Sequence, residues 1–192
     1  MNNRFIVALQ LLIFLLSGSG QILAQEGSTL NDILNYREYS PYFASAGQPS
    51  AEQLQAVRAA GFQRVIYIAF TTNQNALSNE DQIVKELGMD YVHIPVTWTN
   101  PGVRDFQAFV DVMQRDPELK TFLHCQVNAR ASVFSFLYRV IYQNVPLAQA
   151  KADMNTVWEP DAVWQEFIFQ ILAEHAIDPD CPDCNWKREV PE

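Results

Sequence analysis

The sequence predicts a single α/β domain, a mostly parallel central sheet flanked by helices on both faces. Residues 64–70 (RVIYIAF) and 91–96 (YVHIPV) are short runs of β-branched, aromatic and other apolar residues. Such runs are typical of strands buried on both faces of a sheet. Helix-like segments separate them, and alternation of strand with helix favours a parallel sheet. The length of 192 residues and the apolar content of 48% suit one hydrophobic core.

The first half of the domain is expected to alternate strand and helix. Ser50 and Gln53 have the spacing of a capping box, in which each side chain accepts from the other residue's backbone N–H, so a helix begins there. Gly61 ends that helix and Gly88 ends the next, which Ser78 is expected to cap. The expected elements are the strand 42–46, the helix 50–61, the strand 64–70, the helix 78–88 and the strand 91–96.

The second half is expected to hold one more strand among helices. The KTFLH run that ends at His124 has the apolar character of a buried strand. Pro146 and Pro160 favour helix starts, because proline is tolerated in the first turn of a helix. The expected elements are the helix 104–115, the strand 120–124 and the helices 131–142, 146–157 and 160–176.

The first residues have the layout of a secretory signal. Arg4 gives a positive start, residues 5–16 form an apolar run, and Ala24 places a small residue at the cleavage position. The run is shorter than the ~20 residues of a membrane-spanning helix. We therefore expect the signal peptide to be removed and the mature protein to be exported, either periplasmic or secreted. The expected segments are the signal peptide 1–24, a lead-in 25–41, the α/β domain 42–176 and a C-terminal tail 177–192.

The charge balance limits the possible partners. Lys and Arg number 13 against 22 Asp and Glu, which gives a net charge of −9. Nucleic acids and anionic membranes attract basic surfaces, so neither is an expected partner of the mature protein. The composition is that of a soluble, acidic, globular protein.

The cysteines divide into a pair near the C-terminus and one lone residue. Cys181 and Cys184 form a Cys-Pro-Asp-Cys motif, and in an oxidising compartment they are expected to close a small disulfide loop. Metal binding or redox chemistry, and free thiols, are the alternatives. Cys125 is then unpaired, and an unpaired cysteine in an exported protein is a candidate reactive thiol.

The candidate site is the segment HCQVNARAS, residues 124–132. It places Cys125 at the end of a predicted strand, followed by a tight loop and a helix N-terminus, where backbone amides can bind an anion. The amides and Arg130 favour a thiolate, and Arg130 could hold two phosphate oxygens. Ser132 could donate a hydrogen bond to Cys125, and Asn128 suits a turn with positive φ. The expected substrate-binding residues of this loop are Gln126, Val127, Asn128, Ala129 and Ala131.

Several motifs resemble those of cysteine-dependent protein phosphatases of the tyrosine and dual-specificity type. The resemblance is greatest to the bacterial branch related to the beta-lactamase-hydrolase-like phosphatase domain, and it covers residues 44–176. It implies hydrolysis of a phosphomonoester through a phosphocysteine, with Cys125 as nucleophile, Arg130 as phosphate ligand, and His124 orienting the loop and helping to stabilise the thiolate. The motifs that carry the resemblance are SAGQPSAEQL, GFQRVIYI, YVHIPVTW and LHCQVNARAS with SFLYRV behind it.

Two departures from the family pattern keep other functions open. The family signature places five residues between Cys and Arg, whereas four separate Cys125 from Arg130. A loop of this length is similar to that of rhodanese-type sulfurtransferases, in which Cys125 would carry a persulfide. The family's general acid is an Asp about thirty residues before the Cys, and residues 93–99 contain no acid. Asp105 is the nearest candidate, although the first turn of a helix is its expected position.

The alternatives therefore span three classes: a phosphatase, a sulfur-handling enzyme, and a catalytically weak phosphate-binding protein that lacks the acid. The expected ligand of the first and third classes is a phosphorylated small molecule or a phosphoprotein. No cofactor and no metal is expected, because thiolate chemistry in an anion-binding loop requires neither.

Overall fold

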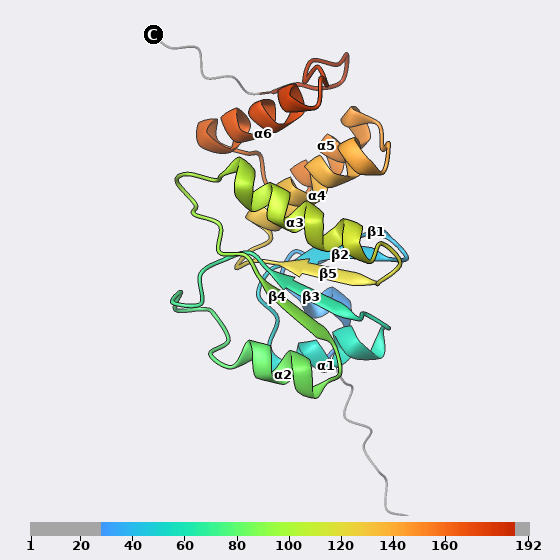
Figure 1. Ribbon diagram of the computed structural model, residues 1–192, viewed down its shortest axis with the longest axis vertical. Coiled ribbons are helices and arrows are strands. Elements are labelled where there is room, and N and C mark those ends of the chain that lie inside the picture. Colours follow the sequence, from blue (N-terminus) through green and yellow to red (C-terminus); the bar gives the residue numbers. More distant parts are fainter. Residues whose placement is uncertain (1–27, 187–192) are drawn as a thin grey trace, which may run out of the picture.

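A central sheet between two layers of helices forms the body of the computed structural model, which describes residues 28–186 (Figure 1). Within those residues the sheet has five strands in the order β1-β2-β5-β3-β4. Only β1 runs antiparallel to its neighbour, and every other pair is parallel. The predicted α/β class with a mostly parallel sheet is confirmed. The strands are β1 (Arg37–Ser40), β2 (Phe43–Ala46), β3 (Arg64–Tyr67), β4 (Asp90–His93) and β5 (Thr121–His124).

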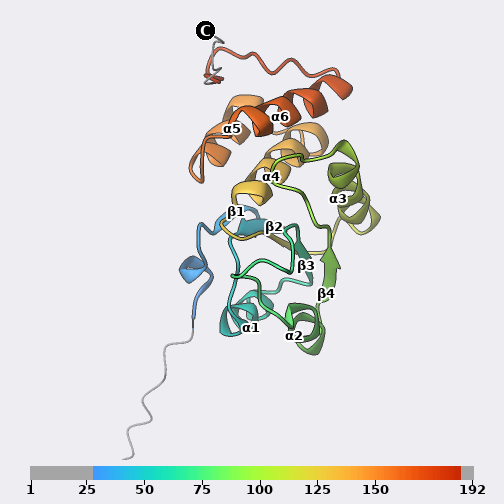
Figure 2. The same ribbon diagram turned by 90° about the vertical axis from the view of Figure 1, so that its left-hand side faces the viewer.

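Helices cover both faces of the sheet (Figures 1 and 2). On one face lie α1 (Ala51–Ala59) and α2 (Glu80–Glu86). The other face carries α3 (Val103–Arg115), α4 (Ala129–Tyr142), α5 (Leu147–Asn155) and α6 (Ala162–Glu174). A short 3-10 helix, η1 (Leu30–Asp32), precedes β1. None of the helices described between residues 28 and 186 is long and apolar enough to cross a membrane.

The strands differ from expectation at the edges of the sheet. The segment 25–41 was expected to be only a lead-in, but it contributes β1, a polar, half-exposed antiparallel strand without an apolar run to reveal it. Strand β4 was expected to be buried on both faces, yet it is an edge strand whose residues are exposed or half-buried. The apolar Ile94 and Val96 that suggested burial follow β4 and are themselves buried. The predicted signal peptide, 1–24, lies outside the described residues.

The helix starts follow local chemistry in most cases. The Ser50 capping box is present, with Gln53 N donating to Ser50 Oγ at 3.2 Å and Ser50 N donating to Gln53 Oε1 at 2.9 Å. Ser78 does not cap α2, which starts after Asn79. The expected start of α4 at residue 131 is two residues late, because the turn at Asn128 already directs the chain into the helix.

The two faces of the sheet pack into separate hydrophobic clusters. Neighbouring residues of β5 point to opposite faces, so Phe122 packs with Phe62 beneath α1 and α2. Leu123 belongs to the larger cluster beneath α3, α4 and α6, which also contains Phe109 and Phe134. Full burial of one such side chain stabilises the fold by about 1.5–3 kcal/mol. Strand β5 is thereby held rigidly from both sides, up to the point where it enters the candidate site.

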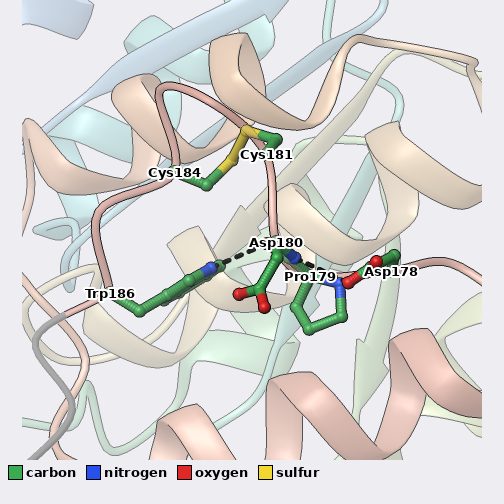
Figure 3. The surroundings of a disulfide bond; sticks show 6 residues. All are labelled: Asp178, Pro179, Asp180, Cys181, Cys184 and Trp186. Carbon is green, nitrogen blue, oxygen red and sulfur yellow. Dashed lines mark hydrogen bonds between the residues drawn. A yellow bond between two sulfur atoms is a disulfide. The ribbon is translucent and has the colours of Figure 1, made fainter.

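A disulfide joins Cys181 to Cys184 just after α6 (Figure 3). The segment beyond it is anchored by Trp186, whose Nε1 donates to Pro179 O at 2.9 Å. The Trp186 ring also packs edge-on against Phe136 of α4 and Phe169 of α6. The described part of the tail is therefore docked on the helical layer.

Candidate active site

The loop after β5 places Cys125 at the carboxyl edge of the sheet. Cys125 is fully buried, and its backbone N–H donates to Ala46 O of the neighbouring strand β2 at 3.3 Å. Asn128 takes a φ of +70°, a left-handed conformation that Asn tolerates better than most residues. Asn128 Nδ2 donates to Asn35 O at 2.7 Å, which ties the loop to the segment before β1. The chain then enters α4 at Ala129.

The backbone amides of this loop are available for a ligand. An isolated antiparallel bridge pairs Val127 with Gly47 and directs the Asn128 N–H toward the end of β2. Within the described part of the chain, the other backbone N–H groups of the loop, those of residues 126, 127 and 129–131, bind no protein acceptor. Ser132 is the first residue after the loop whose N–H is satisfied, by Asn128 O at 2.8 Å. Unsatisfied N–H groups at the start of a helix form a binding site for an anion. Of the predicted binding residues, Gln126, Val127, Ala129 and Ala131 contribute these free N–H groups, whereas Asn128 forms the turn.

Arg130 adds a positive charge to the anion site. Its side chain is nearly buried, its Nε donates to Val96 O at 3.1 Å, and its guanidinium lies 5.2 Å from the ring centroid of Trp98. Its terminal nitrogens bind no acceptor among the described residues, so two parallel N–H groups remain for a phosphate. The pKa of the Tyr67 phenol is raised to about 12, mainly by burial and to a smaller extent by Glu80 and Cys125. The positive charge of Arg130 opposes this shift.

His124 lies under the loop in a row of rings. Its imidazole is fully buried and stacks on Tyr67 with ring centroids 4.7 Å apart, and Tyr67 in turn stacks on His93 at 5.3 Å. These three residues are register partners on β5, β3 and β4. The role of His124 in orienting the loop stays a prediction. His93 contacts Ala69 O through Nε2 at 2.7 Å.

Sequence reasoning missed the partner of His124. Glu80, the first residue of α2, is buried, and its Oε1 lies 2.8 Å from His124 Nε2. The two atoms are close, but their directions do not meet hydrogen-bond geometry. Glu80 Oε2 accepts a hydrogen bond from Gln48 Nε2 at 3.2 Å. The sequence around Glu80 does not indicate that it is buried, because an acid in the first turn of a helix is also common on exposed surfaces.

Two predicted catalytic side chains are engaged elsewhere. Ser132 Oγ donates to Ala129 O at 2.9 Å, a bond within the first turn of α4, instead of to the Cys125 thiol. Asp105 lies in the first turn of α3, as expected, and its carboxylate accepts from Gly102 N at 3.1 Å. The Asp105 carboxylate therefore caps a helix, and no contact joins it to Cys125 or Arg130.

Three tryptophans hold the segment after β4 against the start of α4. The rings of Trp98, Trp158 and Trp164 lie within 5.2 to 6.2 Å of one another. Trp158 Nε1 donates to Ala129 O at 3.0 Å, and Trp164 Nε1 donates to Trp98 O at 3.1 Å. Trp164 is fully buried, whereas Trp98 is 36% exposed and forms a wall beside Arg130.

Apolar side chains surround the loop at the same edge of the sheet. A cavity of about 420 Å³ opens beside Gln126 and Val127, between the start of α1 and the segment before α2. Its apolar lining includes Leu34, Pro49 and Leu77. Four of the large hydrophobic side chains that are exposed in the described structure lie on the segments at this edge: Leu34, Phe70, Trp98 and Val127.

The arrangement suits nucleophilic attack on a bound oxyanion. A thiol, free amides and one arginine follow one another in the segment after β5, and such groups can bind and attack a phosphate group. Among residues 28–186, no group of three or more His, Cys, Asp or Glu side chains could hold a metal ion.

Comparison with known proteins finds one family and many related structures. The family described as "DSP-PTPase phosphatase fused to NAD+ Kinase" matches residues 24–165. A putative phosphatase from Shewanella putrefaciens CN-32 is 32% identical in sequence, with a TM-score of 0.70, and the match covers 76% of this chain and 96% of that one. No curated protein matches the chain.

More distant structures share the fold alone. The core catalytic domain of the PP-IP phosphatase SIW14 from S. cerevisiae, in complex with citrate, has a TM-score of 0.59 at 14% identity, covering 76% of this chain and 86% of that one. TpbA from P. aeruginosa, in complex with pTyr, has a TM-score of 0.58 at 13% identity, covering 74% of this chain and 91% of that one.

Proposed function

Because the chain belongs to the DSP-PTPase family of cysteine-dependent phosphatases, we propose that it hydrolyses a phosphomonoester through a phosphocysteine on Cys125. The observation that carries the proposal is the loop itself. Cys125 precedes a stretch of backbone amides, most of which bind no protein acceptor, and the guanidinium of Arg130 follows. These groups provide a nucleophile and a binding site for the dianion that it attacks.

The proposed reaction has two steps. The Cys125 thiolate attacks phosphorus, so that an S–P bond forms as the P–O bond to the leaving group breaks. Water then attacks the phosphocysteine, the S–P bond breaks, and phosphate leaves as the thiolate is restored. The backbone amides of residues 126, 127 and 129–131 and the Arg130 guanidinium bind the equatorial oxygens in both steps. His124, held by its ring stack, keeps the start of the loop in place.

The leaving group is expected to depart with little help from the protein. Asp105 caps α3 through Gly102 N, and the loss of a general acid costs typically ~10²–10⁴ in rate. Good leaving groups, such as phenolates, depend least on that acid. The proposal therefore includes a preference for aryl over alkyl phosphates.

The surroundings of the loop favour a substrate with one phosphate and an apolar body. The apolar-walled cavity beside Gln126 and Val127 and the exposed ring of Trp98 offer contacts for such a body. The net charge of −9 disfavours a polyanion. A phosphorylated small molecule and a phosphoprotein both fit this description, and duplex nucleic acid does not.

Export is part of the proposal. Residues 1–24 have the layout of a signal peptide, and the disulfide between Cys181 and Cys184 suits an oxidising compartment such as the periplasm or the exterior.

The test is turnover of an aryl phosphate by the protein lacking residues 1–24, from acidic to neutral pH, beside Cys125→Ser. We expect turnover that is inhibited by vanadate and lost in the variant. Arg139→Lys, on the same helix but paired with Asp153, serves as a control that keeps activity. A folded but inactive wild-type protein would contradict the proposal, and transfer of sulfur from thiosulfate to Cys125 would replace it with the persulfide function.

A further inference from the structure

Glu80 is a buried carboxylate that has no role in the reaction steps proposed above. It is 3% exposed, and its two oxygens face two different partners on neighbouring segments. One oxygen lies 2.8 Å from His124 Nε2, and the other accepts from Gln48 Nε2 at 3.2 Å. A carboxylate removed from water without a positive partner is strongly disfavoured. The partner that the structure supplies is the imidazole of His124.

Among the described residues, Glu80 is the one acidic side chain that contacts His124. The ring is stacked on Tyr67 of β3 and on Phe122 of its own strand, with centroids 4.7 and 5.7 Å away. The neighbouring strand β2 contributes Ala46 as the register partner. Neither imidazole nitrogen has an aligned hydrogen bond, so no neutral acceptor competes with Glu80.

The other ionisable groups near Glu80 and His124 belong to residues that surround this pair. Tyr67 separates His124 from His93, and the Tyr67 hydroxyl donates to Phe70 O at 3.1 Å. Cys125 follows His124 in the chain, and Cys125 and Arg130 both contribute to the electrostatic surroundings of Tyr67. Burial raises the pKa of the Tyr91 phenol, and the charge of Glu80 raises it further.

We propose that Glu80 is a positioning residue that holds His124 as an imidazolium and so favours the thiolate of Cys125. This inference rests on the proposed function of Cys125 as a nucleophile. The charges then alternate from α2 to the loop: carboxylate, imidazolium, thiolate and the guanidinium of Arg130. Each neighbouring pair is attractive, and the buried surroundings strengthen that attraction relative to water. Gln48 fixes the far oxygen of Glu80, so the carboxylate cannot rotate away from His124 without losing a hydrogen bond.

The inference is tested on the Glu80→Gln variant, which keeps the shape of the side chain and removes its charge. Asp81→Asn is the matched control, because it removes the same charge from the next residue of α2, where the side chain is 55% exposed and paired with Lys85. The readout is the ultraviolet absorbance of the thiolate as a function of pH, with the signal of Cys125→Ser subtracted. This readout does not depend on turnover, so it separates the role of Glu80 from the phosphatase activity.

We expect the midpoint of the thiolate titration to move to higher pH by about one unit or more in Glu80→Gln, the size typical of a lost neighbouring charge. Asp81→Asn should leave the midpoint unchanged. In a His124→Asn background, Glu80→Gln should add no further shift, since Glu80 acts through the imidazole. An unchanged midpoint in Glu80→Gln, or an equal shift in the His124→Asn background, would overturn the proposal.

A second measurement uses the unaltered protein and does not depend on how any variant folds. The chain has three histidines, so nitrogen NMR of their rings can follow each one. We expect one imidazole, assigned to His124 by its absence in His124→Asn, to stay protonated through neutral pH. A neutral His124 ring at pH 7 would overturn the proposal even if the protein hydrolyses phosphate esters through Cys125.

Discussion

Arg130→Lys tests the anion site, because it keeps the positive charge and removes the planar pair of N–H donors. In the structure Arg130 is oriented by its Nε bond to Val96 O at 3.1 Å, which leaves its terminal nitrogens for the phosphate. A lysine can supply one donor to phosphate but cannot make both contacts. Loss of a hydrogen bond to a charged group costs about 1.5–3 kcal/mol, and loss of the orienting bond about 0.5–1.5 kcal/mol.

The total of about 2–4.5 kcal/mol corresponds to a fall in kcat/KM of roughly 30- to 2,000-fold, since each 1.36 kcal/mol is tenfold. The assay is aryl-phosphate hydrolysis over a range of substrate concentrations, with vanadate inhibition measured in parallel. Vanadate should bind more weakly in the same variant, because it occupies the same oxygen sites.

The matched control is Arg139→Lys, and it lies on the same helix. Arg139 is also nearly buried, stacks over Tyr39 at 4.5 Å and donates to Asp153 at 2.7 Å. This substitution should lower thermal stability as much as Arg130→Lys does, yet it should leave kcat/KM within about threefold. Equal loss of activity in both variants, or wild-type kcat/KM in Arg130→Lys, would refute the assignment of Arg130 to the phosphate.

Three further predictions concern the loop, the helix cap and the tail. Asn128→Ala should lower the free energy of unfolding by about 1–3 kcal/mol, because Ala is strained at a φ of +70° and cannot donate to Asn35 O. Asn128→Gly should lower it less, and equal losses for the two variants in chemical denaturation would contradict this explanation. Asp105→Asn should leave aryl-phosphate kcat unchanged within about threefold while lowering the melting temperature slightly, since its carboxylate caps α3; a hundredfold loss of kcat would assign it to proton transfer instead. Replacing both Cys181 and Cys184 with Ser should lower the free energy of unfolding by about 2 kcal/mol, because the disulfide restricts the unfolded chain, and it should leave aryl-phosphate turnover unchanged. Loss of turnover in that variant would show that the tail is coupled to the site of Cys125.

Features that depend on neighbouring residues in the sequence could be predicted. The capping box of Ser50 and Gln53 is a contact over three residues, and the structure contains both of its hydrogen bonds. The strand 64–70 was foreseen as a buried run, because β3 lies between β5 and β4 and needs apolar residues on both faces. The position of Cys125 follows from the same logic, since the carboxyl ends of parallel strands meet at one edge.

Features that depend on contacts between distant segments could not be predicted. Glu80 meets His124 only because the fold brings the first residue of α2 to the end of β5, and the sequence around Glu80 gives no sign of its burial. The hydroxyl of Ser132 has two possible partners, the Cys125 thiol and the Ala129 carbonyl, and only the geometry of the first turn of α4 selects Ala129. Strand β1 was missed because an exposed edge strand with polar residues lacks an apolar pattern.

The central claim is that Cys125 forms a covalent bond to phosphorus, and the most direct measurement is mass spectrometry of the protein quenched in acid during aryl-phosphate turnover. The account predicts a peptide containing Cys125 that carries one added phosphoryl group, absent from Cys125→Ser and more abundant when the second step is slowed. Turnover of the substrate with no adduct on Cys125, or an adduct on another residue, would contradict it.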